Sequence, residues 1–290
     1  MKIAVIFFGQ LRTSLEASSN LQRFFGSNKI DFFVHTWDTN THRRPLNLKI
    51  PDNEHEQIKH EVFDKFIQIY QPINIIIEKQ KEYWARITDR YGYTGDLTNL
   101  WHSCYYSDQL RIQYEKLNNF KYDVVVRLRP DSIFPPDRFL DQDIQNFFED
   151  RNSLYYLDLF GDTYHIAGSK TMSIATNFYK NLPMYGNTDW LMPKFIEYLN
   201  NKGIQSRIMN DNRGSILREE YKNIDPNIYY YHLSLINSII YEQINFGKEM
   251  HNCTFTNLSN PNWRSDMRDI LSSLFLNPKV ATEYFDFLKK

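Results

Sequence analysis

The segment Tyr122–Phe134 restricts the possible folds of this chain more than any other part of the sequence. It reads YDVVVRLRPDSIF, in which three valines and a leucine stand between turn residues. A short, β-branched run of this kind is typical of a strand that is buried on both faces, as in the middle of a parallel sheet. Pro130 has no N–H to give to a neighbouring strand, so pairing should stop there and leave Asp131 in a loop.

Charged side chains share one face of this expected strand. Because side chains alternate along a strand, Asp123, Arg127, Arg129 and Asp131 fall on the same side. Buried charges need partners, and open α/β sheets bind ligands at the carboxyl ends of their central strands. Asp131 is therefore a candidate ligand-binding residue. The alternative is a buried Arg–Asp ion pair that only closes the strand.

Strand patterns and helix patterns alternate from the first residue. Thr13 and Glu16 have the spacing of a capping box at the start of the first helix pattern. Alternation of this kind predicts right-handed crossovers and a three-layer, mostly parallel, Rossmann-like α/β sheet. The strand patterns cover 2–8, 30–35, 73–77, 122–128 and 153–158, and the helix patterns cover 13–25, 53–70 and 98–117.

The remaining segments are less regular. Residues 39–51 and 135–152 read as irregular, and 79–96, with its two glycines, reads as a loop near the cleft that could act as a lid. No linker or repeat divides the chain. We expect a core over 1–205 and a C-terminal extension with helices over 206–290 that packs on this core.

Composition excludes several classes of protein. A net charge of −1 over 290 residues argues against a chain built to bind nucleic acid or an anionic membrane, and no apolar stretch is long enough to span a bilayer. Cys104 and Cys253 are the two cysteines, too far apart in sequence to indicate a disulfide scaffold or a zinc motif. These features predict a soluble protein of a reducing compartment, in the cytoplasm.

Two loops after the first strands carry candidate binding residues. Gly9, Gln10 and Arg12 lie between the first strand and its helix, where backbone N–H groups and a guanidinium favour a phosphate. Trp37 and Asp38 follow the second strand, where a ring could stack on a base and a carboxylate could accept from a ribose hydroxyl. An ordinary βα loop with a surface arginine, and a tryptophan used for packing, are the alternatives.

In their order, these segments resemble the A-fold (GT-A-like) glycosyltransferases of lipopolysaccharide and capsule synthesis and of large DNA viruses. The resemblance covers roughly residues 1–205. It rests on Gly9-Gln10-Leu11-Arg12-Thr13, on His35-Thr36-Trp37-Asp38, on the central segment that ends in Arg129-Pro130-Asp131, and on Gly161-Asp162-Thr163 with Ile166-Ala167-Gly168.

The resemblance implies that a sugar is transferred from a nucleotide diphosphate donor to a glycan or another hydroxyl acceptor. It also implies Mn²⁺ or Mg²⁺ at the diphosphate, with Asp131 as the metal ligand and Gly9, Gln10, Arg12, Trp37 and Asp38 around the nucleotide. The first Asp of the family's Asp-x-Asp motif is replaced here by Arg129, which makes metal dependence an open question. Arg127 and Arg129 are expected either to hold the diphosphate or to neutralise Asp123 and other buried carboxylates.

Asp162 and Asp189 are the carboxylates expected on the acceptor side, for sugar contact or base catalysis. Asp162 is favoured because it stands beside a glycine on a strand near the expected cleft. Asp189 lies in the first turn of a helix pattern, where a carboxylate commonly only complements the helix dipole. A sugar-nucleotidyltransferase and a non-catalytic carbohydrate-binding protein of the same fold remain the alternative functions.

Overall fold

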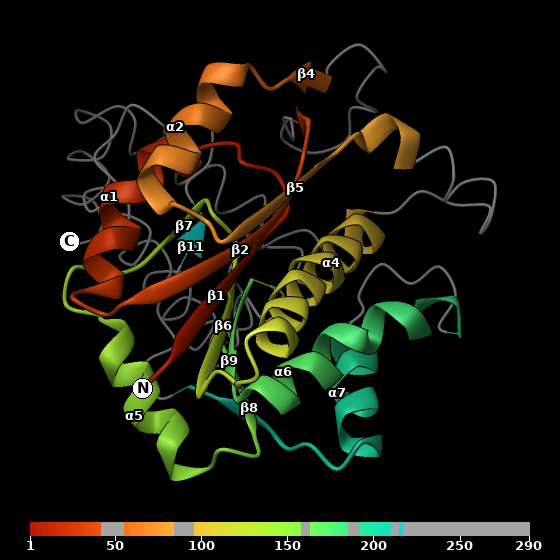
Figure 1. The fold of residues 1–290 in the computed structure, drawn as a ribbon. Coiled ribbons are helices and arrows are strands. Elements are labelled where there is room, and N and C mark those ends of the chain that lie inside the picture. Colours follow the sequence, from red (N-terminus) through yellow and green to blue (C-terminus); the bar gives the residue numbers. More distant parts are fainter. Residues whose placement is uncertain (42–54, 84–95, 158–162, 185–191, 210–214, 217–290) are drawn as a thin grey trace, which may run out of the picture.

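The computed structural model describes residues 1–41, 55–83, 96–157, 163–184, 192–209 and 215–216. Its centre is a seven-stranded sheet in the order β10-β8-β9-β6-β1-β2-β5 (Figure 1). Every neighbouring pair is parallel except those made by β9, which runs antiparallel to both β6 and β8. The strands of this sheet are β1 (Ile3–Phe8), β2 (Ile30–Trp37), β5 (Asn74–Glu78), β6 (Val124–Leu128), β8 (Leu154–Tyr156), β9 (Tyr164–Ala167) and β10 (Ser206–Ile208).

The valine-rich strand β6 lies in the middle of this sheet, as the sequence predicts. All five of its residues are buried, with β1 on one side and β9 on the other. Val124 and Val126 belong to one apolar core, and Val125 belongs to a second core on the opposite face. The predicted alternation of faces along β6 is therefore confirmed.

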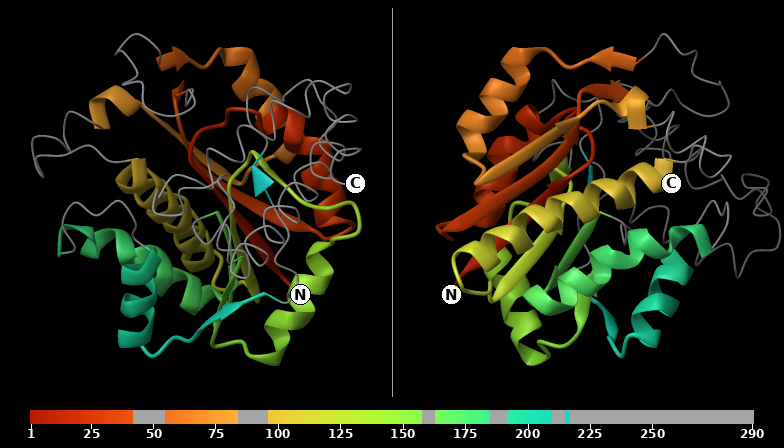
Figure 2. Two further views of the ribbon diagram at one scale, coloured as in Figure 1. Left: turned by 180° about the vertical axis from the view of Figure 1, so that it is seen from behind. Right: turned by 45° about the vertical axis from the view of Figure 1, so that its right-hand side comes forward.

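Helices cover both faces of the sheet and complete a three-layer α/β fold, which confirms the predicted fold class (Figures 1 and 2). The helices α1, α2 and α5 pack on the face that contains Val5 and Phe7, whereas α4, α6, η3 and α7 pack on the face of Ala4 and Ile6. Their bounds are α1 (Ser14–Phe25), α2 (His60–Tyr70), α4 (Asp96–Leu117), α5 (Leu140–Glu149), α6 (Ser169–Thr176), the 3₁₀ helix η3 (Asn177–Met184) and α7 (Met192–Asn201).

The direction in which the sheet grows reverses between β1 and β6. From β1 the chain continues outward through β2 to β5, and α4 then returns it to the other side of β1. Open α/β sheets bind ligands outside the carboxyl ends of their strands at such a reversal. The carboxyl ends of β1 and β6 are therefore the place where a binding crevice is expected.

Several local predictions were wrong. Thr13 precedes α1 but its side chain does not cap the helix, so the expected capping box with Glu16 does not form. Residues 139–150, expected to be irregular, contain α5, because Gln142 accepts a hydrogen bond from the Phe139 N–H at the helix start.

Short strands also occur where loops were expected. Residues 39–41 form β3 (Thr39–Thr41), which pairs antiparallel with β4 (His55–Gln57), and α2 begins only after β4. After the turn at Asp131, β7 (Ser132–Ile133) pairs antiparallel with β11 (Ser215–Ile216). Just beyond residue 205, β10 forms an edge of the main sheet. Residues 217–290, where the terminal helices were expected, lie outside the described residues.

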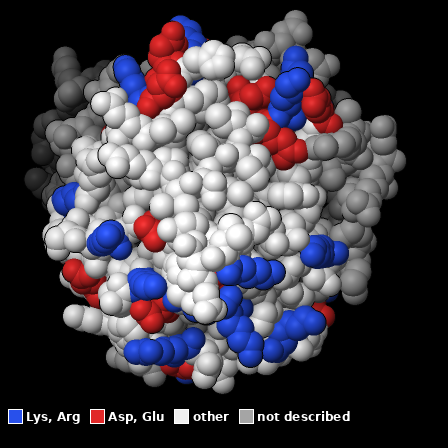
Figure 3. All heavy atoms as spheres, viewed as in Figure 1, with Lys and Arg blue, Asp and Glu red and all other residues white. Residues whose placement is uncertain are grey.

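Charge is unevenly distributed on the face shown in Figure 3, where Lys and Arg side chains gather in the lower half. Among the described helices, none combines the length and the hydropathy that a membrane-spanning segment needs.

Candidate functional site

The loops that follow β1 and β6 leave the sheet side by side. The register pairs Phe7 with Leu128, so the two chains run on together toward Gly9 and Pro130. Residues 9–13 and the turn at 129–132 therefore lie next to each other, at the place where the crevice is expected. Most of the residues predicted to bind a donor lie on these two segments or on the neighbouring end of β2.

The loop after β1 has an unusual backbone. Gly9 has a φ of 92° and Arg12 a φ of 40°, a region that residues other than glycine seldom occupy. Asn40 holds Arg12 in this conformation by accepting from its N–H at 2.9 Å, and Arg12 Nε donates to Gln10 Oε1 at 3.0 Å. Strained residues of this kind cluster at ligand-binding sites, where surrounding contacts hold them.

Gln80 joins this loop to the end of β2. Its side-chain oxygen accepts from Gln10 Nε2 at 2.8 Å and from Thr39 Oγ1 at 2.7 Å, while its backbone N–H donates to Asp38 Oδ1 at 3.0 Å. The structure thus brings together Gln10, Arg12 and Asp38, which the sequence predicts as neighbours around one ligand. Sequence reasoning did not identify Gln80, because it lies in a segment that has no regular apolar pattern.

Trp37 does not present a face to a ligand. It is 1% exposed, and its ring packs against Tyr83, with ring centroids 5.0 Å apart, and stacks on His102 at 5.4 Å. Stacking of Trp37 on a nucleobase, as predicted, is therefore not available in this arrangement. β2 continues to residue 37 rather than ending at His35, so Trp37 belongs to the strand and not to the loop after it. Its buried ring supports this end of the strand.

Asp131 lies in the turn after β6 and is fully buried. Arg129 binds it with two parallel hydrogen bonds, Nε to Oδ1 at 2.9 Å and Nη2 to Oδ2 at 2.6 Å. Both carboxylate oxygens are thus taken up by a guanidinium. A Mn²⁺ or Mg²⁺ ion would have to displace Arg129, and among the described residues Asp131 belongs to no group of three carboxylate, imidazole or thiol ligands.

Arg127 and Asp123 have surroundings different from those expected. Arg127 is fully buried, with its guanidinium 4.8 Å from the centre of the Phe8 ring and 4.7 Å from the Trp101 ring. Asp123 lies at the opposite end of β6, is exposed, and accepts a hydrogen bond from the Lys2 N–H at 2.7 Å. Neutralisation of Asp123 is therefore wrong, whereas the expected neutralisation of another buried carboxylate is found between Arg129 and Asp131.

Three other predicted features lie outside the described residues: Asp162, Asp189 and most of the lid segment 79–96. Of that segment, residues 80–83 form a helical turn directly after β5.

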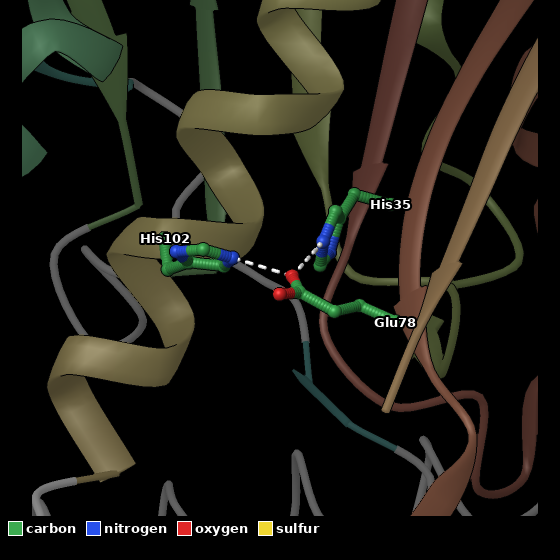
Figure 4. Close-up of side chains that lie close together, drawn as sticks. All are labelled: His35, Glu78 and His102. Atoms are coloured by element: carbon green, nitrogen blue, oxygen red, sulfur yellow. Dashed lines mark hydrogen bonds and ion pairs between the residues drawn. The ribbon is translucent and has the colours of Figure 1, made fainter. Parts of the chain in front are cut away.

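A second cluster, which sequence reasoning missed, lies behind the loop after β1 (Figure 4). His35 on β2 and His102 on α4 both direct their Nε2 atoms at one oxygen of Glu78, at the end of β5, at 3.1 and 2.6 Å. Both imidazoles are buried, and the Glu78 side chain is 22% exposed. Burial raises the pKa of Glu78, but the hydrogen bonds from His102 and His35 outweigh burial and bring the pKa well below its ordinary value.

Comparisons with known proteins give a general structural likeness only. No family model and no curated protein sequence matches the chain. A protein of Desulfovibrio desulfuricans, provisionally named a nucleotide-diphospho-sugar transferase, superposes with a TM-score of 0.39 at 11% identity over 72% of this chain and 80% of its own. Mouse xyloside xylosyltransferase 1 gives a TM-score of 0.33 at 8% identity over 81% of this chain and 83% of its own. A nucleoside-diphosphate-sugar pyrophosphorylase of Vibrio cholerae gives 0.39 at 11% identity over 77% of this chain and 99% of its own.

Proposed function

We propose that this chain transfers a sugar from a nucleotide diphosphate donor to a glycan or another hydroxyl acceptor. The observation that carries the proposal is that two segments follow neighbouring strands at the same end of the sheet: the strained, glycine-containing loop that carries Arg12 into the N-terminus of α1, and the turn that carries Arg129. Such a place suits an anionic ligand, since fixed cations and helix N-termini both stabilise phosphate.

The chemistry needs charge stabilisation more than covalent catalysis. When the bond from the sugar to the diphosphate breaks, negative charge builds up on the leaving oxygens, and fixed donors lower the energy of that state. Arg12 is only partly buried and lies in the loop between β1 and α1, so in this proposal its guanidinium binds the diphosphate. Asp131 fixes Arg129 in position, and Asp38 and Gln10 bind the nucleoside.

The divalent ion expected at Asp131 does not fit this arrangement, because both oxygens of the carboxylate are bound to Arg129. In this proposal the charge of the diphosphate is therefore stabilised by arginine side chains and not by a metal ion at Asp131. Asp162 remains the proposed acceptor-side carboxylate, in contact with the sugar or the acceptor. Asp189 is a second candidate for this role. Separate Asp→Asn variants assayed for donor hydrolysis and for transfer test both assignments. Transfer and hydrolysis that both persist in Asp162→Asn would remove Asp162 from the site.

Calorimetric titration of the full chain with UDP and GDP, with and without Mn²⁺, tests the proposal. We expect saturable binding of one nucleotide, which Arg12→Ala weakens by about 1–3 kcal/mol. A panel of nucleotide-sugar donors then identifies the substrate by slow donor hydrolysis. A chain that binds no nucleoside diphosphate, with or without the ion, would contradict the proposal.

A further inference from the structure

The cluster of His35, Glu78 and His102 has the composition of a metal site. Two imidazole nitrogens and a carboxylate are the ligands of several zinc and non-haem iron sites, which leave further positions open. The three ligand atoms lie within 4.8 Å of one another, and among the described residues this is the one such group of three. We propose that it binds a divalent first-row transition ion such as Zn²⁺, separately from the donor site.

The spacing of the ligand atoms is close to what such an ion requires. With bonds of about 2.0–2.2 Å and tetrahedral or octahedral angles, neighbouring ligand atoms lie about 2.8–3.6 Å apart. The separation between His35 Nε2 and Glu78 Oε2 is 3.1 Å and already fits. The 2.6 Å separation between His102 Nε2 and Glu78 Oε2 must widen by a few tenths of an ångström or more. Glu78 is the most exposed of the three side chains, so it can move and give the ion access.

Hydroxyl groups hold the far nitrogen of each imidazole, as the second shell of a metal site does. His102 Nδ1 lies 2.9 Å from Tyr179 Oη, and His35 Nδ1 lies 2.9 Å from Ser103 Oγ. Ser103 also accepts from the Gly9 N–H and lies 3.0 Å from the His35 carbonyl. Its single hydrogen can serve the carbonyl, so its oxygen can accept from His35 Nδ1–H, which is the role of a second-shell group when Nε2 binds an ion.

Each Nε2 faces the Glu78 carboxylate at hydrogen-bonding distance. A metal ion bound between the imidazoles and the carboxylate would take the place of the protons in these two hydrogen bonds. The rings are already positioned: His102 packs between Trp37 and Tyr83, with centroids 5.4 and 4.1 Å away, so little ordering remains for binding to cost. The ligand set also sets the choice of ion, since imidazole favours zinc and its neighbours over Mg²⁺.

The first test uses the metal ions alone. Full-length protein is stripped with a chelator and titrated calorimetrically with ZnCl₂ and, in parallel, with MgCl₂. We expect saturable binding of one Zn²⁺, a rise in the thermal midpoint on addition of Zn²⁺, and no response to Mg²⁺. Absence of saturable Zn²⁺ binding, or equal binding of Mg²⁺, overturns the proposal.

Variants locate the ion. Removal of a ligand in Glu78→Gln or His102→Gln should weaken Zn²⁺ binding by more than about 100-fold, since loss of a second-shell partner alone costs about 10–100-fold. The matched control is His60→Gln, which changes an exposed histidine at the start of α2 and should leave Zn²⁺ affinity unchanged. Zn²⁺ binding that survives both ligand changes in folded protein overturns the assignment.

Two further measurements test the proposal if the ligand variants do not fold: Zn²⁺ binding to a Tyr179→Phe variant, and the proton spectrum of the wild-type protein with Co²⁺ bound. Tyr179→Phe should weaken Zn²⁺ binding by about 10–100-fold, whereas Tyr106→Phe, whose ring packs 4.5 Å from the His102 ring, should not. The Co²⁺-substituted wild-type protein should show two strongly shifted proton resonances that exchange with solvent, one from each imidazole Nδ1–H. A Co²⁺ protein without them overturns the proposal, and none of these results depends on nucleotide binding.

Discussion

A comparison of Arg12→Gly with Arg12→Ala separates two properties of this residue: the strain of its backbone and the binding of a ligand by its side chain. Arg12 has a φ of 40°, so its backbone is strained, while its side chain is partly exposed in the loop between β1 and α1. Glycine removes both the strain and the guanidinium, whereas alanine removes only the guanidinium. We therefore expect both variants to lose nucleotide affinity and only Arg12→Ala to retain the backbone strain.

The size of each effect follows from these contacts. A left-handed conformation costs about 1–2 kcal/mol in a residue that has a Cβ, and the extra unfolded-state entropy of glycine offsets about 0.5–1 kcal/mol of that gain. Arg12→Gly should therefore be about 1 kcal/mol more stable than Arg12→Ala. Both variants lose the hydrogen bond from Nε to Gln10 and the proposed bond to the diphosphate, so UDP affinity should fall by about 1–3 kcal/mol, roughly 5- to 150-fold.

Urea unfolding measures the stability of each variant, and calorimetry measures its affinity for UDP. Gln71 provides the matched control, because it has a φ of 44° at the C-terminal end of α2, outside the crevice. Gln71→Gly should likewise be about 1 kcal/mol more stable than Gln71→Ala, with unchanged UDP affinity for both. If Arg12→Ala is as stable as Arg12→Gly, the strain argument fails. If both Arg12 variants bind UDP normally, the guanidinium does not contact the ligand.

Three further predictions concern buried polar groups. Arg111→Met leaves Asp108 and Glu115 buried without the guanidinium that binds them at 2.7 Å, so the free energy of unfolding in urea should fall by about 3–5 kcal/mol at neutral pH. Burial raises the pKa of Glu115, but Arg111 and Lys121 bring it below its ordinary value. The stability that this lowered pKa provides is present above the pKa of the unfolded chain and is lost as pH falls through the folded pKa. The cost of Arg111→Met should therefore shrink in acid, and a pH-independent cost would contradict this origin. Asp131→Asn replaces one partner of a buried ion pair and should lower the free energy of unfolding by about 1–3 kcal/mol in thermal melts; an unchanged midpoint would show that Arg129 does not depend on this carboxylate. Ser103→Ala removes the oxygen that accepts from the Gly9 N–H and should cost about 1–3 kcal/mol, whereas no loss of stability would mean that water satisfies that N–H.

Much of the fold could be predicted because apolar patterns decide it locally. The run of valines at 124–126 can only be buried, and the alternation of strands and helices before it requires a parallel sheet. The direction of β9 could not be predicted, since a four-residue strand carries no signal of which neighbour it joins. The helix α5 was missed although Leu140, Ile144 and Phe147 have helical spacing, because the preceding prolines and acidic residues favoured an irregular segment.

The candidate site was predictable only where it follows a strand. Gly9, Asp38 and Asp131 each come after a recognisable strand, so their common edge of the sheet follows from topology. The hydrogen bonds from Arg129 to Asp131 depend on the rotamers of both side chains, and these cannot be predicted from the sequence. His102 lies within a helix whose surface is polar at many positions, and Glu78 ends an edge strand; only the packing of α4 across β2 and β5 brings them together.

The topology of the sheet also has a consequence for the order of folding. Ile3 pairs with Ile30 in β2 and with Val124 in β6, so the second pairing closes a segment roughly four to five times longer, at an extra entropic cost of about 1 kcal/mol. The half of the sheet made of β1, β2 and β5 can therefore form while β6 is still unpaired, and the crevice between β1 and β6 is completed late. Pulse-labelled hydrogen exchange should protect β2 amides before β6 amides, and simultaneous protection would contradict this order. The ligand site of this chain would then come into existence only with the last cooperative step of folding.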